Sequence, residues 1–326
     1  MKPILFFVTL ILATLCIAGF TSEKIVDGNK SGYNAPLFLQ GFTETMRKPS
    51  RVTLQYILPQ RALSNLAGWL ANSERPWLKN YLIRYFLNRF TVDMSEAIVA
   101  NPYDYPSFNA FFTRQLKPER RPIVQGATQI ASPADGFISQ IGSIQEDTLL
   151  QAKGFHFTLV DLLGGSEKRA APFKNGAFAT IYLAPKDYHR VHMPFTGKLR
   201  ESIFIPGKLF SVDPQTTTGI PNLFARNERL VCIFDTSEGP MAVIMVGAML
   251  VGSMETVWHA KTQSTEMIRE SYAGSLQLSR GAEMGYFKMG STVIILFGKD
   301  KATWAETLHP DSSVRMGEEI GTLSHP

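Results

Sequence analysis

The stretch Tyr286-Phe-Lys-Met-Gly-Ser-Thr-Val-Ile-Ile-Leu-Phe297 is the most informative part of this chain. Its second half is a run of β-branched, aliphatic and aromatic residues, which predicts a buried β-strand from Val293 to Phe297. Gly290, Ser291 and Thr292 stand directly in front of that strand. A glycine followed by a hydroxyl residue at such a place can hold a strained peptide bond for attack by the neighbouring side chain. The same tripeptide also fits a bulge or tight bend that only glycine tolerates, so the motif alone leaves both interpretations open.

Upstream blocks narrow the interpretation, because they occur in a recognisable order. They are Ser132-Pro-Ala-Asp135-Gly136, Asp187-Tyr-His189-Arg-Val-His192-Met-Pro194, Leu209-Phe-Ser211-Val212, Asn222-Leu-Phe-Ala-Arg-Asn-Glu-Arg229 and Val246-Gly-Ala-Met-Leu-Val-Gly-Ser253. Together with Gly-Ser-Thr, these blocks resemble the phosphatidylserine decarboxylase family in its bacterial form, which is made as a proenzyme. The resemblance runs from about Leu54 to about Phe297. The family usually has Leu before Gly-Ser-Thr, and Met289 keeps an apolar side chain there.

This resemblance implies that the chain cleaves itself between Gly290 and Ser291. Ser291 would attack the carbonyl of Gly290, with His192 as general base and Asp135 orienting that histidine in a charge relay. Elimination and loss of ammonia would leave a pyruvoyl group made from Ser291. The expected products are a large chain, residues 1–290, and a small chain, residues 291–326, which form a heterodimer; a higher oligomer is left open.

The same resemblance implies the reaction. The pyruvoyl group would be the covalent cofactor, in the role usually given to pyridoxal phosphate, and no metal is expected. Its ketone would form a Schiff base with phosphatidylserine and accept the electrons released with carbon dioxide, giving phosphatidylethanolamine. His189 is the expected proton donor, because imidazole titrates near working pH. Ser211 is a candidate substrate contact, although it could equally serve a turn.

Two other functions are compatible with parts of this sequence. A serine hydrolase could use Asp135, His192 and Ser291 on an external ester, but no Gly-x-Ser-x-Gly motif surrounds Ser291. A non-enzymatic, membrane-binding β protein would need none of this chemistry.

The spacing of His189 and His192 would place them on opposite faces of a straight strand, so we expect a bent segment that turns both toward Ser291. Their His-x-x-His pattern lacks a nearby third ligand for zinc, and two cysteines, Cys16 and Cys232, make no disulfide framework.

The net charge of +5 is unevenly distributed and indicates a partner. Residues 46–90 contain one acid, Glu74, and eight basic residues: Arg47, Lys48, Arg51, Arg61, Arg75, Lys79, Arg84 and Arg89. Tryptophan and tyrosine are interleaved with them. Basic and aromatic residues together fit an anionic membrane surface or nucleic acid. Since no RNA-binding signature accompanies them, we expect the membrane and no nucleic acid.

The N-terminus adds a second route to the membrane. Residues 3–22 carry no charge and are just long enough to span a bilayer, so residues 1–22 are an anchor or a cleaved signal. The resemblance implies an active site that faces the cytoplasm, which agrees better with an uncleaved anchor. The expected location is therefore the cell membrane, with the protein either peripheral or N-terminally anchored.

The remaining pattern predicts an α+β fold, with membrane-associating N-terminal helices packed on a β-rich catalytic domain. Residues 23–49 are a polar linker. Residues 50–116 form a helical, membrane-associating region, with Leu63, Leu66, Ala67 and Leu70 at helical spacing. Pro59 and Pro76 separate its helices, and Ser107 can cap a further helix to residue 112. Residues 117–326 form the β-rich domain, with strands predicted at Phe178–Leu183, Leu230–Phe234, Met241–Val251, Thr256–His259 and Val293–Phe297.

Overall fold

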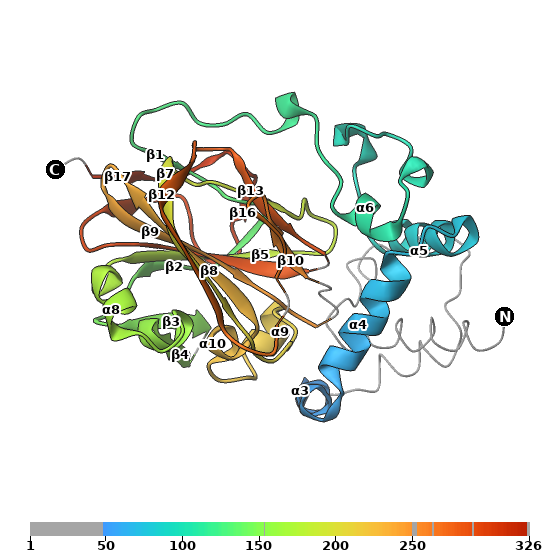
Figure 1. Ribbon diagram of the computed structural model, residues 1–326, viewed down its shortest axis with the longest axis horizontal. Helices are drawn as coiled ribbons and strands as arrows, with labels where there is room; N and C mark the ends of the chain where they lie inside the picture. The colour runs from blue at the N-terminus through green and yellow to red at the C-terminus, as the bar shows by residue number, and fades with distance from the viewer. Residues whose placement is uncertain (1–47, 153, 250–252, 263, 289, 325–326) are drawn as a thin grey trace.

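The computed structural model describes residues 48–152, 154–249, 253–262, 264–288 and 290–324 (Figure 1). The hydrophobic segment at residues 1–22 and nearly all of the 23–49 linker lie outside these residues. Within the described part of the chain, no helix combines the length and the apolar composition needed to cross a bilayer.

The N-terminal part is helical, as predicted. It contains α3 (Lys48–Ile57), α4 (Gln60–Ala71), α5 (Pro76–Arg89) and α6 (Phe108–Phe112), with short 3-10 turns η1 (Met94–Glu96), η2 (Pro102–Asp104) and η3 (Pro118–Arg120). Pro59 separates α3 from α4, and Pro76 begins α5, where its missing N–H leaves no bond unmade. The predicted cap is also confirmed, because the Ser107 hydroxyl accepts a hydrogen bond from the Ala110 amide.

An antiparallel sheet of eight strands forms the centre of the rest. Its order is β12-β7-β8-β9-β14-β5-β2-β16. The strands are β2 (Gly136–Ser143), β5 (Ala177–Leu183), β7 (Gly197–Ile205), β8 (Arg229–Thr236), β9 (Gly239–Val246), β12 (Ile268–Leu278), β14 (Ser291–Phe297) and β16 (Ser313–Val314). The motif-bearing strand β14 therefore lies in the middle, hydrogen-bonded to β5 on one side and β9 on the other.

Three smaller sheets and several short helices complete the domain. One sheet has the order β11-β10-β13-β6, a second β1-β17-β15, and a third pairs β3 with β4. Their bounds are β1 (Gln129–Ala131), β3 (Thr148–Ala152), β4 (Phe155–Thr158), β6 (Arg190–His192), β10 (Met254–Thr256), β11 (His259–Thr262), β13 (Glu283–Phe287), β15 (Ala302–Trp304) and β17 (Glu319–Leu323). The short helices are α7 (Leu159–Leu162), α8 (Glu167–Ala170), η4 (Ala171–Phe173), α9 (Pro214–Thr217) and α10 (Leu223–Arg226). The strand predicted at Thr256–His259 is wrong: Thr256 pairs with His259 across the turn between β10 and β11.

Side chains of β14 fill a core on each face of the large sheet, which explains its unbroken apolar run. Val293, Ile295 and Phe297 belong to one buried cluster, and Ile294 and Leu296 belong to the other. The first cluster also contains Val191 of β6 and Phe287 of β13, so the four-stranded sheet packs on that face. By strand alternation, Ser291 shares this face with Val293.

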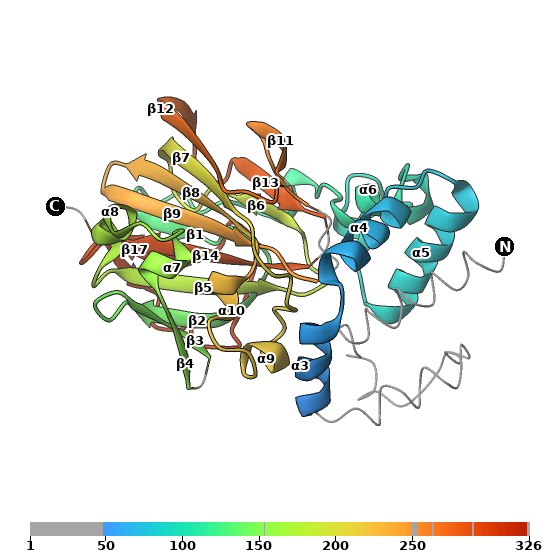
Figure 2. The ribbon, with the colours of Figure 1, turned by 60° about the horizontal axis from the view of Figure 1, so that its bottom comes forward.

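The helices pack against one end of the β-rich part, which confirms the predicted α+β architecture (Figures 1 and 2). The Tyr56 ring of α3 lies 5.0 Å from the ring of Phe210. Met249, which follows β9, joins the buried cluster of α4, α5 and α6. The helical part is thus attached to the end of the large sheet where β9 ends and β14 begins.

Candidate active site

The Gly290–Ser291 peptide lies where the chain passes from the four-stranded sheet into the large sheet. Before it, the Phe287 amide donates to the carbonyl of His189, and the Lys288 amide donates to the carbonyl of Ser253, each at 3.0 Å. After it, Ser291 pairs in register with Leu183, the last residue of β5. Both Gly290 and Ser291 are buried, and Met289 lies outside the described residues. The peptide is therefore anchored on both sides by ordered strands and shielded from water.

His189 reaches this place because it follows a tight turn at the end of β5. The Ala184 amide donates a hydrogen bond to the Asp187 carboxylate at 2.8 Å, and the Asp187 amide donates one to the carbonyl of Ala184 at 2.9 Å. The ring of His189 packs on Phe112 of α6, with 4.2 Å between ring centres. This turn precedes both histidines, and His192 lies in β6, so a bend that directs both rings toward Ser291 remains a prediction.

The protonation of His189 follows from its surroundings. Its Nδ1 lies 2.9 Å from the carbonyl oxygen of Asp187, which can only accept, so Nδ1 carries the proton. Complete burial lowers the pKa of His189 to about 3, which keeps the ring neutral at pH 7. Its Nε2 is then a bare lone pair, and it has no hydrogen-bond partner among the described residues.

The hydroxyl of Ser291 is also without a partner. It is fully buried and, like Nε2 of His189, lacks a hydrogen-bond partner in the described part of the chain. The hydroxyl of Thr292 is buried and unpartnered too, but Thr292 lies on the opposite face of β14, beside Val246. A buried polar atom without a partner costs about 1–3 kcal/mol, so each of these atoms calls for an explanation. In the self-cleavage predicted from the sequence, the Ser291 hydroxyl is the nucleophile. Nε2 of His189 is a ring nitrogen that is able to take or give a proton.

His192 is held differently, with both ring nitrogens occupied. It pairs with Glu283 in the register of β6 and β13. Nδ1 donates to the carbonyl of Gly281 at 2.9 Å, and Nε2 therefore accepts the Tyr188 hydroxyl at 3.0 Å. Burial lowers the pKa of His192, so this ring is also neutral at pH 7. To take the proton of Ser291, His192 must first release Tyr188.

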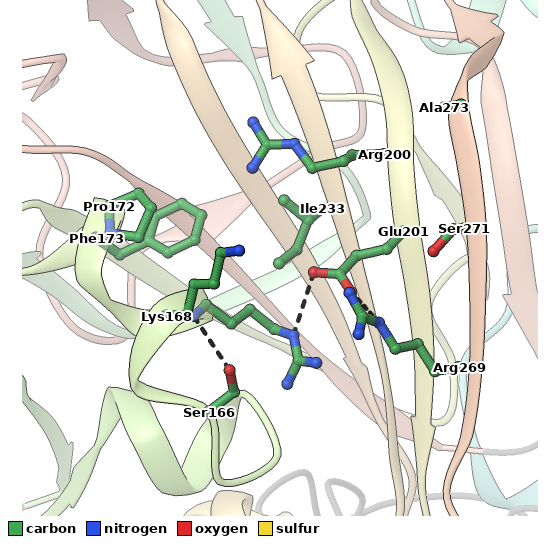
Figure 3. A pocket seen from close by; sticks show the side chains of 11 residues that line it. Ser166, Lys168, Pro172, Phe173, Arg200, Glu201, Ile233, Arg269, Ser271 and Ala273 are labelled. Carbon is green, nitrogen blue, oxygen red and sulfur yellow. Dashed lines mark hydrogen bonds and ion pairs between the residues drawn. The ribbon is translucent and has the colours of Figure 1, made fainter.

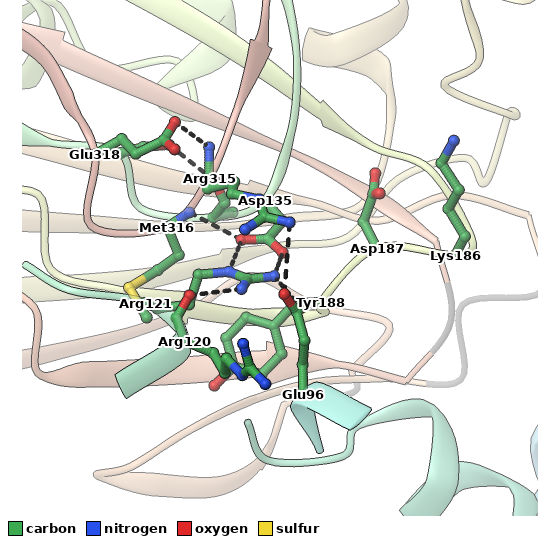
Figure 4. Close-up of polar contacts among 12 residues, drawn as sticks. Glu96, Arg120, Arg121, Asp135, Lys186, Asp187, Tyr188, Arg315, Met316 and Glu318 are labelled. Atoms are coloured by element: carbon green, nitrogen blue, oxygen red, sulfur yellow. Dashed lines mark hydrogen bonds and ion pairs between the residues drawn. The ribbon is translucent and has the colours of Figure 1, made fainter. Parts of the chain in front are cut away.

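Asp135 binds an arginine, not His192 (Figure 4). The Arg121 guanidinium donates to both its carboxylate oxygens, at 2.8 and 2.5 Å, and the Met316 amide donates at 2.8 Å. Arg121 also pairs with Glu96 at 2.9 Å. These donors account for every hydrogen bond of Asp135 among the described residues. The direct Asp135–His192 contact expected from the sequence is therefore wrong for this state of the chain.

The backbone explains how Asp135 is fixed in this place. Gly136 opens β2 against β5, and a Cβ on Gly136 would lie 2.2 Å from the carbonyl oxygen of Tyr182. Only glycine permits this approach, so the Asp-Gly pair serves strand packing. The side chain of Asp135 is thereby directed to Arg121.

Ser211 lies in a loop that is tied to the N-terminal helices. Its amide donates to the side chain of Gln55 at 2.9 Å, and its hydroxyl donates to Asp213 at 2.7 Å. The amide of Leu209 donates to the side chain of Gln60 at 2.8 Å. The loop borders Gly247, which follows the residue of β9 paired with Thr292, so Ser211 is near the start of β14. Its contact with substrate remains a prediction.

Sequence reasoning missed two residues of this site. Tyr188 stands inside the Asp187–His192 block, and a tyrosine so close to two candidate histidines was a signal that it could bond one of them. Arg121 lies between Pro118 and Pro122, where the sequence indicated only that the β-rich domain begins near residue 117, and no local pattern connects Arg121 with Asp135.

A separate pocket of about 430 Å³ lies beside α8, β7 and β12 (Figure 3). Glu201 accepts from both Arg169 and Arg269, and Arg200 pairs with Asp235. Pro172, in its wall, borders Gly298 beyond the far end of β14, roughly 20 Å from Ser291 at the usual strand rise. The pocket is thus an ion-paired surface hollow distant from the unpartnered atoms. Across the described residues, no cluster of three or more His, Cys, Asp or Glu side chains could hold a metal ion.

Comparisons with known proteins point to one family. The sequence profile described as phosphatidylserine decarboxylase matches residues 108–322, and a second profile, described as PSD, matches residues 51–91. The phosphatidylserine decarboxylase proenzyme of Stutzerimonas stutzeri is 52% identical over 276 residues, which cover 83% of this chain and 93% of the relative. The proenzyme of the same name from Bordetella avium is 54% identical over 270 residues, covering 82% and 92%. That of Alcanivorax borkumensis is 51% identical over 286 residues, covering 86% and 98%.

Proposed function

The chain belongs to the phosphatidylserine decarboxylase family, and we propose that it converts phosphatidylserine to phosphatidylethanolamine and carbon dioxide with a pyruvoyl group made from its own Ser291. The observation that carries the proposal is the hydroxyl of Ser291, which is fully buried and unpartnered among the described residues, directly after Gly290. The surroundings support it. Gly136, next to Asp135, borders Tyr182 of β5, which pairs with Thr292, and the carbonyl of His189 accepts from Phe287 at the end of β13.

Maturation begins with attack of the Ser291 hydroxyl on the carbonyl carbon of Gly290. The C–N bond breaks as the C–O bond forms, so the amide becomes an ester. Removal of the α-proton of Ser291 then expels the Gly290 carboxylate and leaves a carbon–carbon double bond. Water hydrolyses the resulting enamine, ammonia leaves, and a ketone remains at the start of residues 291–326. No external oxidant or reductant is needed.

His192 is the proposed base of the first step, and Asp135 supports it through space. Tyr188 must leave Nε2 of His192 before the proton of Ser291 can arrive. The charge of Asp135 favours the protonated form of His192, although its hydrogen bonds go to Arg121 and Met316. In this proposal Asp135 acts on His192 through its charge and not through a hydrogen bond. His192 exchanges only one hydrogen-bond partner, Tyr188 for Ser291.

In the decarboxylation, the pyruvoyl ketone supplies an acceptor for the electron pair left when carbon dioxide departs. His189 is proposed to give the proton to the α-carbon. In the uncut chain burial keeps this ring neutral. A substrate carboxylate beside it would favour its charged form, so proton uptake and substrate binding are expected to be coupled.

The exposed face of the helices supports an anionic membrane as the place of action. Trp69 of α4 and Trp77 and Tyr81 of α5 are 66%, 56% and 40% exposed. Arg84 continues the exposed stripe of α5 at helical spacing. Tryptophan and tyrosine prefer the membrane interface, and arginine favours anionic lipid. We therefore propose a peripheral or N-terminally anchored protein on the cytoplasmic face of the cell membrane.

The test is the intact mass of the purified protein under denaturing conditions, followed by release of carbon dioxide from labelled phosphatidylserine. We expect two chains divided after Gly290, with the smaller one lighter by one ammonia than a peptide starting with Ser291. Ser291→Ala should remain a single, inactive chain. An uncut wild-type chain that reacts with a fluorophosphonate at Ser291 would support a hydrolase and overturn the proposal.

A further inference from the structure

Arg114 is a buried cation whose guanidinium is largely without partners. The residue is 5% exposed, and its Nη2 donates to the carbonyl of Lys186 at 3.0 Å. Nε and Nη1 are buried and have no hydrogen-bond partner among the described residues. The guanidinium lies 5.8 Å from the ring centre of Phe111, which satisfies neither nitrogen. Within the described part of the chain no carboxylate comes within ion-pair distance of it.

Arg229 offers a comparison, because it is another buried arginine of this chain and its guanidinium is fully engaged. Arg229 is 3% exposed, and its Nε, Nη1 and Nη2 donate to the carbonyls of Leu162, Asn227 and Asp161. All three of its nitrogens are therefore satisfied. An unpaired buried charge costs several kcal/mol, so the unfilled donors of Arg114 require another explanation.

The position of Arg114 connects it with the candidate active site. It follows α6, whose Phe112 packs on His189, and it binds Lys186 in the turn that leads to His189. The positive charge of Arg114 is close enough to contribute to the lowered pKa of His189. Its unpartnered nitrogens thus lie near His189, whose Nε2 is also without a hydrogen-bond partner among the described residues.

We infer that Arg114 binds the phosphodiester of the substrate headgroup, an inference that rests on the proposed function. Two anionic groups of phosphatidylserine could meet it, the carboxylate and the phosphodiester. A cation fixed on the carboxylate would stabilise the ground state more than a transition state in which that charge is leaving. The phosphodiester keeps its charge throughout, so binding it secures the substrate without opposing the reaction. A guanidinium is also well suited to phosphate oxygens.

The variants Arg114→Gln and Arg114→Lys test this assignment, with Arg200→Gln as a control. Arg200 is exposed and paired with Asp235 near the distant pocket, so its replacement removes one positive charge without touching the site. Each variant is first examined for cleavage after Gly290 and then assayed with phosphatidylserine in mixed micelles. Inhibition by glycerophosphoethanolamine, which carries a phosphodiester, is compared with inhibition by ethanolamine, which does not.

We expect Arg114→Gln to be cleaved and to raise KM about 10- to 100-fold with little change in kcat, since the lost interaction is equal in ground and transition states. Its preference for glycerophosphoethanolamine over ethanolamine should fall by a similar factor. Arg114→Lys should recover part of both effects, and it takes the place of Arg114→Gln if that variant does not fold. Arg200→Gln should behave as wild type.

An unchanged preference for the phosphodiester inhibitor in the Arg114 variants would overturn the inference. So would a loss confined to kcat, because it would place Arg114 in the chemical step. Absence of wild-type turnover would instead refute the proposed function, so the two failures are distinguishable.

Discussion

Replacing Tyr188 with phenylalanine should accelerate self-cleavage. The Tyr188 hydroxyl donates to Nε2 of His192 across 3.0 Å, and both side chains are buried. If His192 is the base, this bond must break before the proton of Ser291 can be accepted. A hydrogen bond between neutral groups contributes about 0.5–1.5 kcal/mol, and about 1.4 kcal/mol corresponds to a tenfold change in rate. Tyr188→Phe should therefore cleave about 2- to 13-fold faster than wild type.

The measurement is a pulse of labelled cell-free synthesis followed by a chase, with precursor and large chain separated at short intervals. Tyr272→Phe is a suitable control, because it removes a tyrosine hydroxyl that donates to Glu270 on the edge strand β12. The control should cleave at the wild-type rate. Slower cleavage in Tyr188→Phe would refute the reasoning, since it would mean that Tyr188 assists His192 and does not block it.

Other predictions concern the remaining charged groups. His189→Ala should cleave normally but lose at least about 100-fold in decarboxylation, the usual contribution of a general acid; loss of cleavage would show that the two histidines have been assigned the wrong way round. Asp135→Asn should block cleavage in a pulse-chase assay. Arg121→Lys, which also perturbs the buried Arg121–Asp135 pair, should still be cleaved. Equal losses of cleavage in the two variants would mean that the ion pair has only a structural role. Burial raises the pKa of Glu228 from 4.5 to about 7, although the charge of Arg61 opposes the shift. The unfolded chain therefore releases this proton at a lower pH than the folded chain does. As a result, the folded state loses stability as the pH rises from about 4.5 to 7. Glu228→Gln should accordingly increase the free energy of unfolding by about 1 kcal/mol at pH 5 and about 3 kcal/mol at pH 8. Urea titrations of the uncut chain would check this, and equal gains at both pH values would contradict it.

Local patterns predicted the parts of the fold that depend on local forces. The apolar run from Val293 to Phe297 became β14 because both faces of that strand are buried, and such burial selects apolar residues at every position. Ser107 became a helix cap because its hydroxyl bonds an amide three residues ahead. The turn at Val257 and Trp258 was missed because neither residue is a usual turn former, and their β-favouring side chains read as strand.

The sequence nominates the members of the candidate site, but it does not predict their contacts. Asp135, His189, His192 and Ser291 come from motifs that can be recognised in the chain. Their hydrogen bonds depend on which distant segments close around them, and Arg121 could be connected with Asp135 only once η3 and β2 were seen side by side. A spacing pattern carries no information about a competing partner supplied by tertiary packing.

The central place of β14 has a consequence for the life of the mature protein. After cleavage the small chain, residues 291–326, would still be paired with β5 and β9 and, through β17, with β1, so the two chains should separate only when the domain unfolds. Once unfolded, however, they would have to find each other by diffusion, at a rate that falls with dilution. The uncut precursor folds as one chain and meets no such limit. Maturation would thus turn a reversible folding reaction into a nearly one-way one, and the lifetime of the enzyme would be governed by its rate of unfolding.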